Sequence, residues 1–281
     1  MLAHERRGSG PPLVLIHGIG SRRQVWEPVL GELARHREVI ALDLPGFGES
    51  PLWPPVDQPA PGHPSAPGDL PPAGAPPGSV GHLADLVAAF LDELGLARPE
   101  LAGSSLGGGI ALELGRRGRA AAVTAFAPVG FWGPVSRRWC QTVVGGARGL
   151  STALAPALPR LFATRAGRVA LCGIFYGRPG RLSPEDCLGS ARALSRAPGF
   201  AAARRAFGVW RLPVGADPGA LGGIPVTIAW GTRDLVLPHR RQAARARAEL
   251  PAARHVVLPG CGHLPFADDP ARCAELLTVR Q

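Results

Sequence analysis

A serine between two glycines is the first residue whose surroundings suggest chemistry. Ser105 lies in Gly103-Ser104-Ser105-Leu106-Gly107, with a short apolar run before it and helical spacing after it. A serine on a tight strand-to-helix turn needs small residues two positions before and two positions after it, because a Cβ there would clash with neighbouring backbone. The serine oxygen would then stand at a helix N-terminus, where the helix dipole favours developing negative charge. The pattern predicts a nucleophile at position 105.

A serine hydroxyl is a weak nucleophile near neutral pH and needs a histidine base that is itself oriented by a carboxylate. The chain has eight histidines, and all of them are candidates for this base. One of them, His263, lies in a glycine-rich loop after the apolar run His255–Leu258, and one carboxylate, Asp234, follows the apolar run Val226–Trp230. Both residues therefore come directly after expected strands, as Ser105 does. Because ligands bind where the carboxyl ends of parallel strands meet, we expect the three side chains to lie at one edge of a sheet.

The elements that must position these residues alternate along the chain. Short apolar runs without polar alternation are typical of strands buried on both faces, and stretches with apolar residues three and four apart are typical of helices. The expected strands are 12–17, 39–42, 101–102, 123–127, 226–230 and 255–258, and the expected helices are 26–36, 80–94, 107–117, 239–250 and 270–279. Residues 2–7 can supply one more strand. This alternation predicts a mainly parallel sheet with helices on both faces, and Asp269 as the N-cap of the last helix.

Two segments interrupt this rhythm. Residues 51–79 are rich in proline and glycine, which predicts a flexible surface loop without a packed element. Residues 131–222 have helical spacing at 143–154, 184–197 and 199–209 and no convincing strand, which predicts an all-helical cap, or lid. We therefore expect a core formed by residues 1–130 and 223–281, with the cap inserted at residues 131–222.

Five ordered motifs resemble the signatures of the α/β-hydrolase superfamily. They are Gly103-Ser-Ser-Leu-Gly107, His17-Gly-Ile-Gly20, Asp43-Leu-Pro-Gly-Phe-Gly-Glu-Ser50, Trp230-Gly-Thr-Arg-Asp234 and Gly260-Cys-Gly-His-Leu-Pro265. The resemblance covers both parts of the expected core and is to the lid-bearing serine hydrolases, which include esterases and lipases. It implies an α/β-hydrolase fold in which Ser105 is the nucleophile, Asp234 the acid and His263 the base.

The resemblance also implies an oxyanion hole formed by the backbone N–H groups of Ile19 and Leu106. It favours structural roles for His17 and Asp43 over catalytic ones. Some family members carry the acid one strand earlier, but in this chain that strand is followed by Pro128-Val129-Gly130, which offers no carboxylate. The aspartate nucleophile of the family's dehalogenases and epoxide hydrolases is excluded at position 105 because serine occupies it.

The expected reaction is hydrolysis of a carboxylic ester through an acyl-enzyme intermediate. The same three residues could cleave a thioester or a carbon–carbon bond of a β-dicarbonyl-like substrate, and those reactions remain alternatives. A third hypothesis is a non-catalytic ligand-binding protein built on the same fold. No cofactor or metal ion is implied, and the aromatic residues of the expected cap favour an apolar acyl group as the small-molecule substrate.

The charge of the chain is unevenly distributed. The net charge is +10, all 31 basic residues are arginine, and residues 131–222 hold 13 arginines against three acidic residues. Such a surface would suit an anionic substrate, an acidic carrier protein or an anionic membrane surface, although a merely solvated face is the simpler interpretation. A nucleic-acid partner is disfavoured because the first third of the chain is acidic.

The remaining features indicate the compartment. The five cysteines are odd in number and lack metal-site spacing, which argues against a disulfide framework and against a zinc site. The N-terminal residues reach charge without an apolar run, and no long uncharged apolar segment follows. We therefore expect a cytoplasmic protein with neither a signal peptide nor a membrane span.

Overall fold

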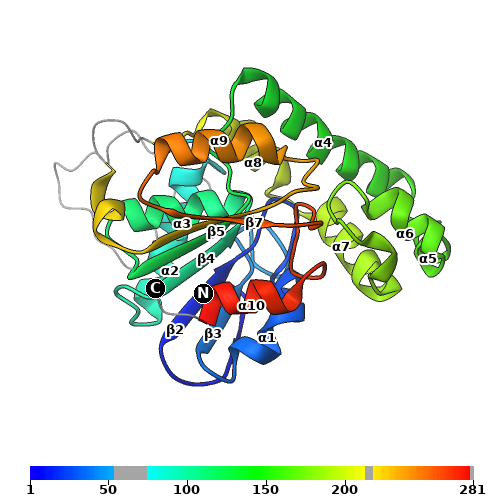
Figure 1. Ribbon diagram of the computed structural model, residues 1–281. Coiled ribbons are helices and arrows are strands. Elements are labelled where there is room, and N and C mark those ends of the chain that lie inside the picture. The colour runs from blue at the N-terminus through cyan, green and yellow to red at the C-terminus, as the bar shows by residue number, and fades with distance from the viewer. Residues whose placement is uncertain (54–74, 213–217, 279–281) are drawn as a thin grey trace, which may run out of the picture.

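The computed structural model describes residues 1–53, 75–212 and 218–278 (Figure 1). Within these residues seven strands form one sheet in the order β1-β3-β2-β4-β5-β6-β7. The strands are β1 (His4–Arg7), β2 (Pro12–Ile16), β3 (Glu38–Leu42), β4 (Glu100–Ser104), β5 (Ala122–Phe126), β6 (Val226–Gly231) and β7 (Arg254–Leu258). Only β1 runs antiparallel, against β3, so the expected mainly parallel sheet is confirmed. The expected flexible loop at 51–79 lies largely outside the described residues.

Helices cover both faces of the sheet, as the alternation predicted (Figure 1). One face packs against α1 (Glu27–Leu33) and α10 (Pro270–Thr278), with Trp26 and Phe266 in the core between them. The other face packs against α2 (Val80–Glu93), α3 (Leu106–Arg116) and α9 (His239–Glu249). The strands β2 to β6 are mostly buried because each of their faces meets a helical layer. The edge strands β1 and β7 are partly exposed, so the expectation that the strand at 255–258 is buried on both faces was wrong. The Asp269 side chain accepts a hydrogen bond from Arg272 N, which confirms its N-cap role.

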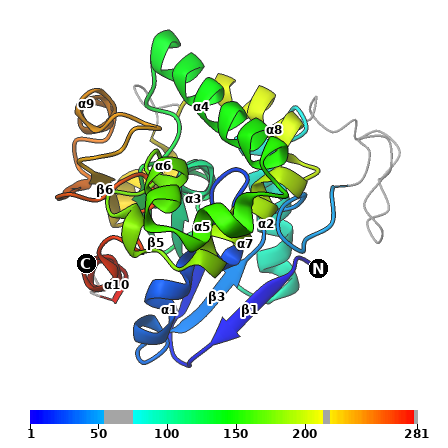
Figure 2. The ribbon, with the colours of Figure 1, turned by 90° about the vertical axis from the view of Figure 1, so that its right-hand side faces the viewer.

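Residues 131–212, which we call the helical insertion, contain only helices between β5 and β6 (Figure 2). The helices are α4 (Pro134–Ala153), α5 (Leu158–Ala163), α6 (Arg165–Cys172), α7 (Pro184–Arg196) and α8 (Phe200–Ala206). The short 3-10 segments of the described chain are Arg23–Trp26, Pro179–Arg181, Phe207–Val209 and Gly219–Gly223. No helix in the described ranges is both long enough and apolar enough to cross a bilayer.

The carboxyl ends of the central strands meet at one edge of the sheet, where the candidate residues follow them. The register pairs Ile16 of β2 with Gly103 of β4, and Phe126 of β5 with both Ser104 and Ala229 of its neighbours. Gly231 of β6 pairs with Leu258 of β7. The loops that carry Ile19, Ser105, Asp234 and His263 therefore all leave the same edge.

Candidate functional site

Ser105 occupies a strained turn between β4 and α3. Its φ is +54°, in the left-handed region that non-glycine residues rarely adopt, which costs about 1–3 kcal/mol. The turn is held by Ser105 N, which donates to Phe126 O at 2.9 Å, and by Val129 N, which donates to Ser105 O at 3.1 Å. The neighbouring strand β5 and the residues after it therefore fix the backbone of Ser105. The side chain is buried, with a residue exposure of 5%.

The two glycines of the pentapeptide are required by close backbone approach. A Cβ at Gly103 would overlap the carbonyl oxygen of Gly107, and a Cβ at Gly107 would overlap the carbonyl oxygen of Ile16. Neither obstacle is the end of a flexible side chain, so the backbone itself would have to shift. The steric reason predicted for the glycine spacing is thus present in the structure.

Asp234 and His263 form a buried pair across two neighbouring loops. His263 Nδ1 lies 2.8 Å from Asp234 Oδ2, and the exposures of the two residues are 4% and 3%. The other carboxylate oxygen, Asp234 Oδ1, accepts hydrogen bonds from Val236 N at 2.9 Å and Leu237 N at 2.8 Å. Since these two amides hold the carboxylate in place, its second oxygen is aimed at the imidazole. His263 then carries its proton on Nδ1 and leaves Nε2 free to accept another.

Trp230 is a residue of this site that sequence reasoning missed. Its indole Nε1 donates to Asp234 Oδ2 at 3.1 Å and to Leu237 O at 2.9 Å. The indole therefore binds both the carboxylate and the turn that holds it. From the sequence, a tryptophan at the end of a buried strand is interpreted as a residue of the hydrophobic core. Its hydrogen bonds could not be predicted, because they depend on the conformation of the turn that follows.

The structure joins the candidate acid to the candidate base but does not hydrogen-bond the nucleophile to them. Among the described residues, no hydrogen bond connects the Ser105 hydroxyl with the His263 imidazole. Hydroxyl–imidazole contacts of this kind are often long without substrate and tighten when the substrate binds. The assignment of Ser105 to the same site therefore depends on the shared sheet edge and on the contacts of the turn described next.

The loop after β2 lies directly against Ser105. A Cβ built on Gly18 would stand 3.1 Å from Ser105 Cβ and 3.7 Å from Ser105 Oγ. Within the described chain, the backbone N–H groups of Ile19 and Leu106 donate no hydrogen bond to another protein group. An oxyanion requires two such donors, so these amides stay the predicted donors of an oxyanion hole.

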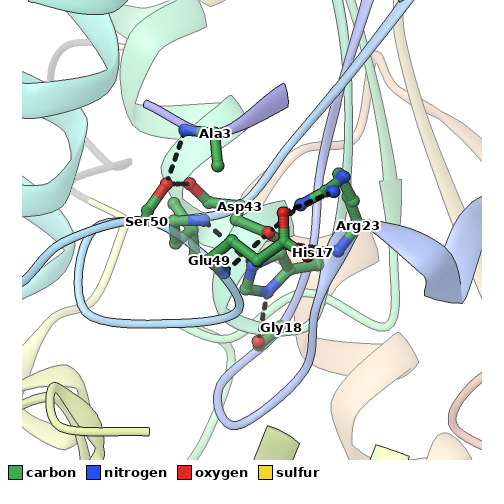
Figure 3. A network of polar contacts seen from close by, with 8 residues as sticks. Ala3, His17, Gly18, Arg23, Asp43, Glu49 and Ser50 are labelled. Atoms are coloured by element: carbon green, nitrogen blue, oxygen red, sulfur yellow. Dashed lines mark hydrogen bonds and ion pairs between the residues drawn. The ribbon is translucent and has the colours of Figure 1, made fainter. Parts of the chain in front are cut away.

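Beneath this loop a polar network holds His17 (Figure 3). His17 is fully buried, with Nδ1 2.7 Å from Gly18 O and Nε2 accepting from Leu44 N at 2.9 Å. These partners require a neutral imidazole with the proton on Nδ1, and burial lowers the pKa of His17. The bond to Gly18 O orients the loop that carries Ile19, which gives His17 the structural role expected from the resemblance.

Asp43, at the end of β3, is the centre of the same network (Figure 3). Its carboxylate accepts from Arg23 N at 2.6 Å and from Glu49 N at 3.0 Å, and it also pairs with the Arg23 guanidinium. Its carbonyl oxygen accepts from the Ser50 hydroxyl at 2.7 Å. The carboxylate and carbonyl oxygens of this fully buried residue thus accept hydrogen bonds from two neighbouring segments, which indicates a scaffold role.

The neutral state of His17 predicts an acid-sensitive stability. Because the folded-state pKa lies below the ordinary value of 6.5, the unfolded chain takes up this proton first as the pH falls. The contribution of neutral His17 to the free energy of unfolding is therefore complete above about pH 6.5. Below that pH it is lost at up to about 1.4 kcal/mol per pH unit. We expect His17→Gln to be less stable at pH 7.5 and to lose less stability between pH 6.5 and 5.5. Urea unfolding at the three pH values measures this, and an unchanged slope would contradict the assignment.

An apolar cavity of about 130 Å³ lies between the core and the helical insertion, and Ser105, Asp234 and His263 are not among the residues that line it. The core contributes Ile19, from the loop beside Ser105, and Leu264, which follows His263. The insertion contributes most of the wall, including Leu158, Phe162, Phe175 and Leu194. The cavity therefore touches the loop after β2 and the loop after β7 and extends among α4, α5, α6 and α7.

The five cysteines are all free and buried in the structure. Cys172 and Cys187 both line the cavity, with their sulfur atoms 3.6 Å apart. Cys261, two residues from His263, is completely buried, and burial raises its pKa to about 11. Its thiol is thus unreactive near neutral pH, consistent with an apolar filler. Among the described residues, no group of three or more histidine, cysteine, aspartate or glutamate side chains could hold a metal ion.

Comparison with known proteins places this site in a family. The model of the alpha/beta hydrolase family matches residues 13–276. An uncharacterized protein of Mycobacterium tuberculosis is 30% identical over 96% of this chain and 75% of its own length. Epoxide hydrolase EphH of the same organism is 33% identical over 70% of this chain and 92% of its own. A thermophilic esterase from Thermogutta terrifontis superposes with a TM-score of 0.67 at 25% identity, covering 98% of this chain and 91% of the esterase.

These matches agree with the strand order, the strained serine turn and the buried aspartate–histidine pair. They extend over both parts of the sheet and across the helical insertion. The chain belongs to the alpha/beta hydrolase family.

Proposed function

We propose that this hydrolase cleaves carboxylic esters with Ser105 as nucleophile, His263 as base and Asp234 as the acid that orients it. The observation that carries the proposal is the 2.8 Å contact between His263 Nδ1 and Asp234 Oδ2, since it leaves Nε2 of a buried imidazole available. The strained turn of Ser105 also supports the proposal, because backbone hydrogen bonds hold both its amide and its carbonyl group.

In the proposed reaction His263 Nε2 takes the proton of the Ser105 hydroxyl as its oxygen attacks the ester carbonyl. The tetrahedral oxyanion accepts hydrogen bonds from the backbone N–H groups of Ile19 and Leu106. Asp234 stabilises the imidazolium that forms, and His263 then passes the proton to the leaving alcohol. Water, activated by the same imidazole, releases the acid from the acyl-enzyme and restores Ser105.

We propose further that the helical insertion acts as a cap whose cavity receives the acyl chain. The apolar wall supports an apolar acyl group, because transfer of each methylene from water contributes about 0.8 kcal/mol. Ile19 and Leu264 are the core residues nearest the candidate triad in sequence that line the cavity. An acyl chain that enters the cavity between them would have its carbonyl beside the two proposed oxyanion donors. Hydrolysis of p-nitrophenyl esters of increasing chain length tests this, and kcat/KM should rise from acetate to longer chains until the cavity is filled.

An epoxide as the substrate is less well supported by the residues of this chain. EphH is named an epoxide hydrolase, but at position 105 this chain carries serine rather than the carboxylate expected for that chemistry. Thioester and carbon–carbon hydrolysis use the same three side chains and remain alternatives. Assay of matched oxygen esters, thioesters and β-dicarbonyl compounds distinguishes the three reactions directly.

Charge on the insertion supports a preference for anionic acyl donors, including one attached to an acidic carrier protein. In the described residues, no arginine of the insertion lies within ion-pair distance of a carboxylate, whereas core arginines such as Arg37 and Arg117 do. Arg160 and Arg165 are exposed on α5 and α6, two of the helices that line the cavity. Unpaired positive charge attracts anions over roughly one Debye length, about 10 Å at 0.1 M salt.

The double variant Arg160→Gln/Arg165→Gln tests this preference. We expect kcat/KM for a negatively charged hemisuccinate ester to fall about two- to fivefold at low salt, because the lost attraction acts on encounter. Turnover of a neutral butanoate ester should not change. The control is Arg241→Gln/Arg247→Gln, which removes the same charge from exposed positions on α9, outside the helical insertion. Equal losses on both esters, or equal losses in both double variants, would rule out the electrostatic preference.

A further inference from the structure

Asp268 is a buried carboxylate that the proposed reaction does not use. Its exposure is 4%, and it follows His263 by five residues, before the N-cap of α10. A buried carboxylate is costly unless donors satisfy both oxygens. All the donors bonded to its two carboxylate oxygens are backbone N–H groups, and they come from two segments that are far apart in sequence.

The first segment is the wall of the cavity. Gly177 N donates to Asp268 Oδ2 and Arg178 N donates to Asp268 Oδ1, each at 2.7 Å. The guanidinium of Arg178 adds a bond from Nη1 to the carbonyl oxygen of Asp268 at 2.9 Å. Phe175 and Tyr176, which immediately precede these amides, line the cavity. The carboxylate therefore fixes the chain between α6 and the 3-10 segment Pro179–Arg181.

The second segment is the histidine loop itself. Gly262 N, the amide next to His263, donates to Asp268 Oδ2 at 2.8 Å. One oxygen atom thus accepts from both segments. Leu264 N also donates to Phe175 O at 2.9 Å, so the residues on each side of His263 are bonded to this one junction.

The two segments touch so closely that side chains are excluded between them. A Cβ on Gly262 would lie 2.5 Å from Phe175 O and 2.7 Å from Gly177 N. A Cβ on Gly177 would overlap the carbonyl oxygen of Gly260. Backbone packed at this distance transmits a displacement of one segment directly to the other.

We infer that Asp268 is a positioning residue that locks the loop bearing His263 to the wall of the acyl cavity. This inference rests on the proposed function for the role of His263. The carboxylate holds the loop that presents the imidazole toward Ser105, and the same bonds hold Phe175 and Tyr176 in the wall of the cavity. A shift of about 1 Å at such a position can cost two orders of magnitude in rate.

Asp268→Asn tests the inference with nearly unchanged shape. An amide offers one oxygen and turns an NH₂ group toward amides that are themselves donors, so at least one of the three bonds is lost. We expect kcat for p-nitrophenyl butanoate, counted per site titrated with a fluorophosphonate, to fall at least tenfold. KM for the acetate ester should stay within twofold, whereas KM for the hexanoate ester should rise at least threefold as the cavity wall loosens.

Asp269→Asn is the matched control, since the neighbouring aspartate caps α10 and bonds to neither segment. Because asparagine caps a helix about as well as aspartate, this variant should change thermal stability little and keep kcat per titrated site within twofold of the wild type. Counting active sites removes any loss due to unfolded protein, so a purely structural role of Asp268 would also leave kcat per site unchanged. That result in Asp268→Asn would overturn the inference.

Hydrogen exchange provides a readout that does not depend on activity, and its wild-type measurement needs no variant. The amides of Gly177, Arg178 and Gly262 should exchange slowly despite their loop positions, and Asp268→Asn should accelerate exchange in both segments together. Fast exchange of these amides in the wild type would contradict the claim that Asp268 joins the two segments. If the wild type fails to label at Ser105, the proposed function fails, and the exchange data still decide whether Asp268 joins the two segments.

Discussion

Replacement of Ser105 by alanine is expected to lower kcat for a p-nitrophenyl ester about 10⁴- to 10⁶-fold. The loss is this large because the acyl-enzyme can no longer form, so only the oxyanion donors and substrate binding continue to act. Stability should not fall with activity, since removal of one oxygen from a position with φ of +54° leaves the backbone bonds in place. Initial rates and thermal unfolding of the same preparation measure both quantities.

Ser104→Ala provides the control for that experiment. The two serines are adjacent, and the Ser104 hydroxyl is buried without a hydrogen-bond partner in the described part of the chain. Its removal leaves no other group unsatisfied, so activity should remain within a few-fold of the wild type. A Ser105→Ala enzyme that kept more than a hundredth of the wild-type kcat would show that another residue attacks the substrate.

Asp234→Asn is expected to lower kcat about 10⁴-fold, the second largest effect. The amide oxygen can keep the bonds from Val236 N and Leu237 N, so the side chain should stay in place. The amide NH₂ group would then face His263 Nδ1 and the Trp230 indole, both of which are donors in the wild type. The imidazole must shift its proton to Nε2, and that nitrogen can no longer act as a base toward Ser105.

The rate of labelling by a fluorophosphonate separates this explanation from simple unfolding. Asp234→Asn should fold, and its rate of reaction with a fluorophosphonate should fall in parallel with kcat, because both steps need the same deprotonation of Ser105. A folded Asp234→Asn enzyme with more than a tenth of the wild-type kcat would exclude Asp234 as the orienting acid.

The sheet and its covering helices could be predicted from local patterns. Strands such as β2 and β6 are buried on both faces, so their apolar runs are visible without knowledge of their neighbours. The positions of Ser105 and Asp234 followed from the same fact, because each comes after such a strand, whereas His263 follows the partly exposed edge strand β7. The parallel register then brings their loops to one edge.

The helical insertion was predicted less completely. Helical spacing indicated 143–154, but α4 begins at Pro134, and neither α5 nor α6 was expected. The two missed helices contain only 6 and 8 residues, fewer than the roughly 11 residues over which a helical period can be recognised in a sequence. The division into core at 1–130 and 223–281 and cap at 131–222 stays a prediction.

Contacts between distant segments could not be predicted at all. Asp268 and Asp269 are identical in type and adjacent, and only the N-cap pattern before Pro270 distinguished the second. The role of Asp268 depends on Gly177, about ninety residues earlier in the chain. The approach of Cys172 to Cys187 likewise depends on how α6 packs on α7.

The most direct test of the proposed site is peptide mapping after reaction with a fluorophosphonate. The wild type should gain one phosphonyl group, located on Ser105, and His263→Ala should label at least a hundredfold more slowly because no base removes the hydroxyl proton. Labelling of the wild type at another residue, or an equal rate in folded His263→Ala, would contradict the assignment of these residues.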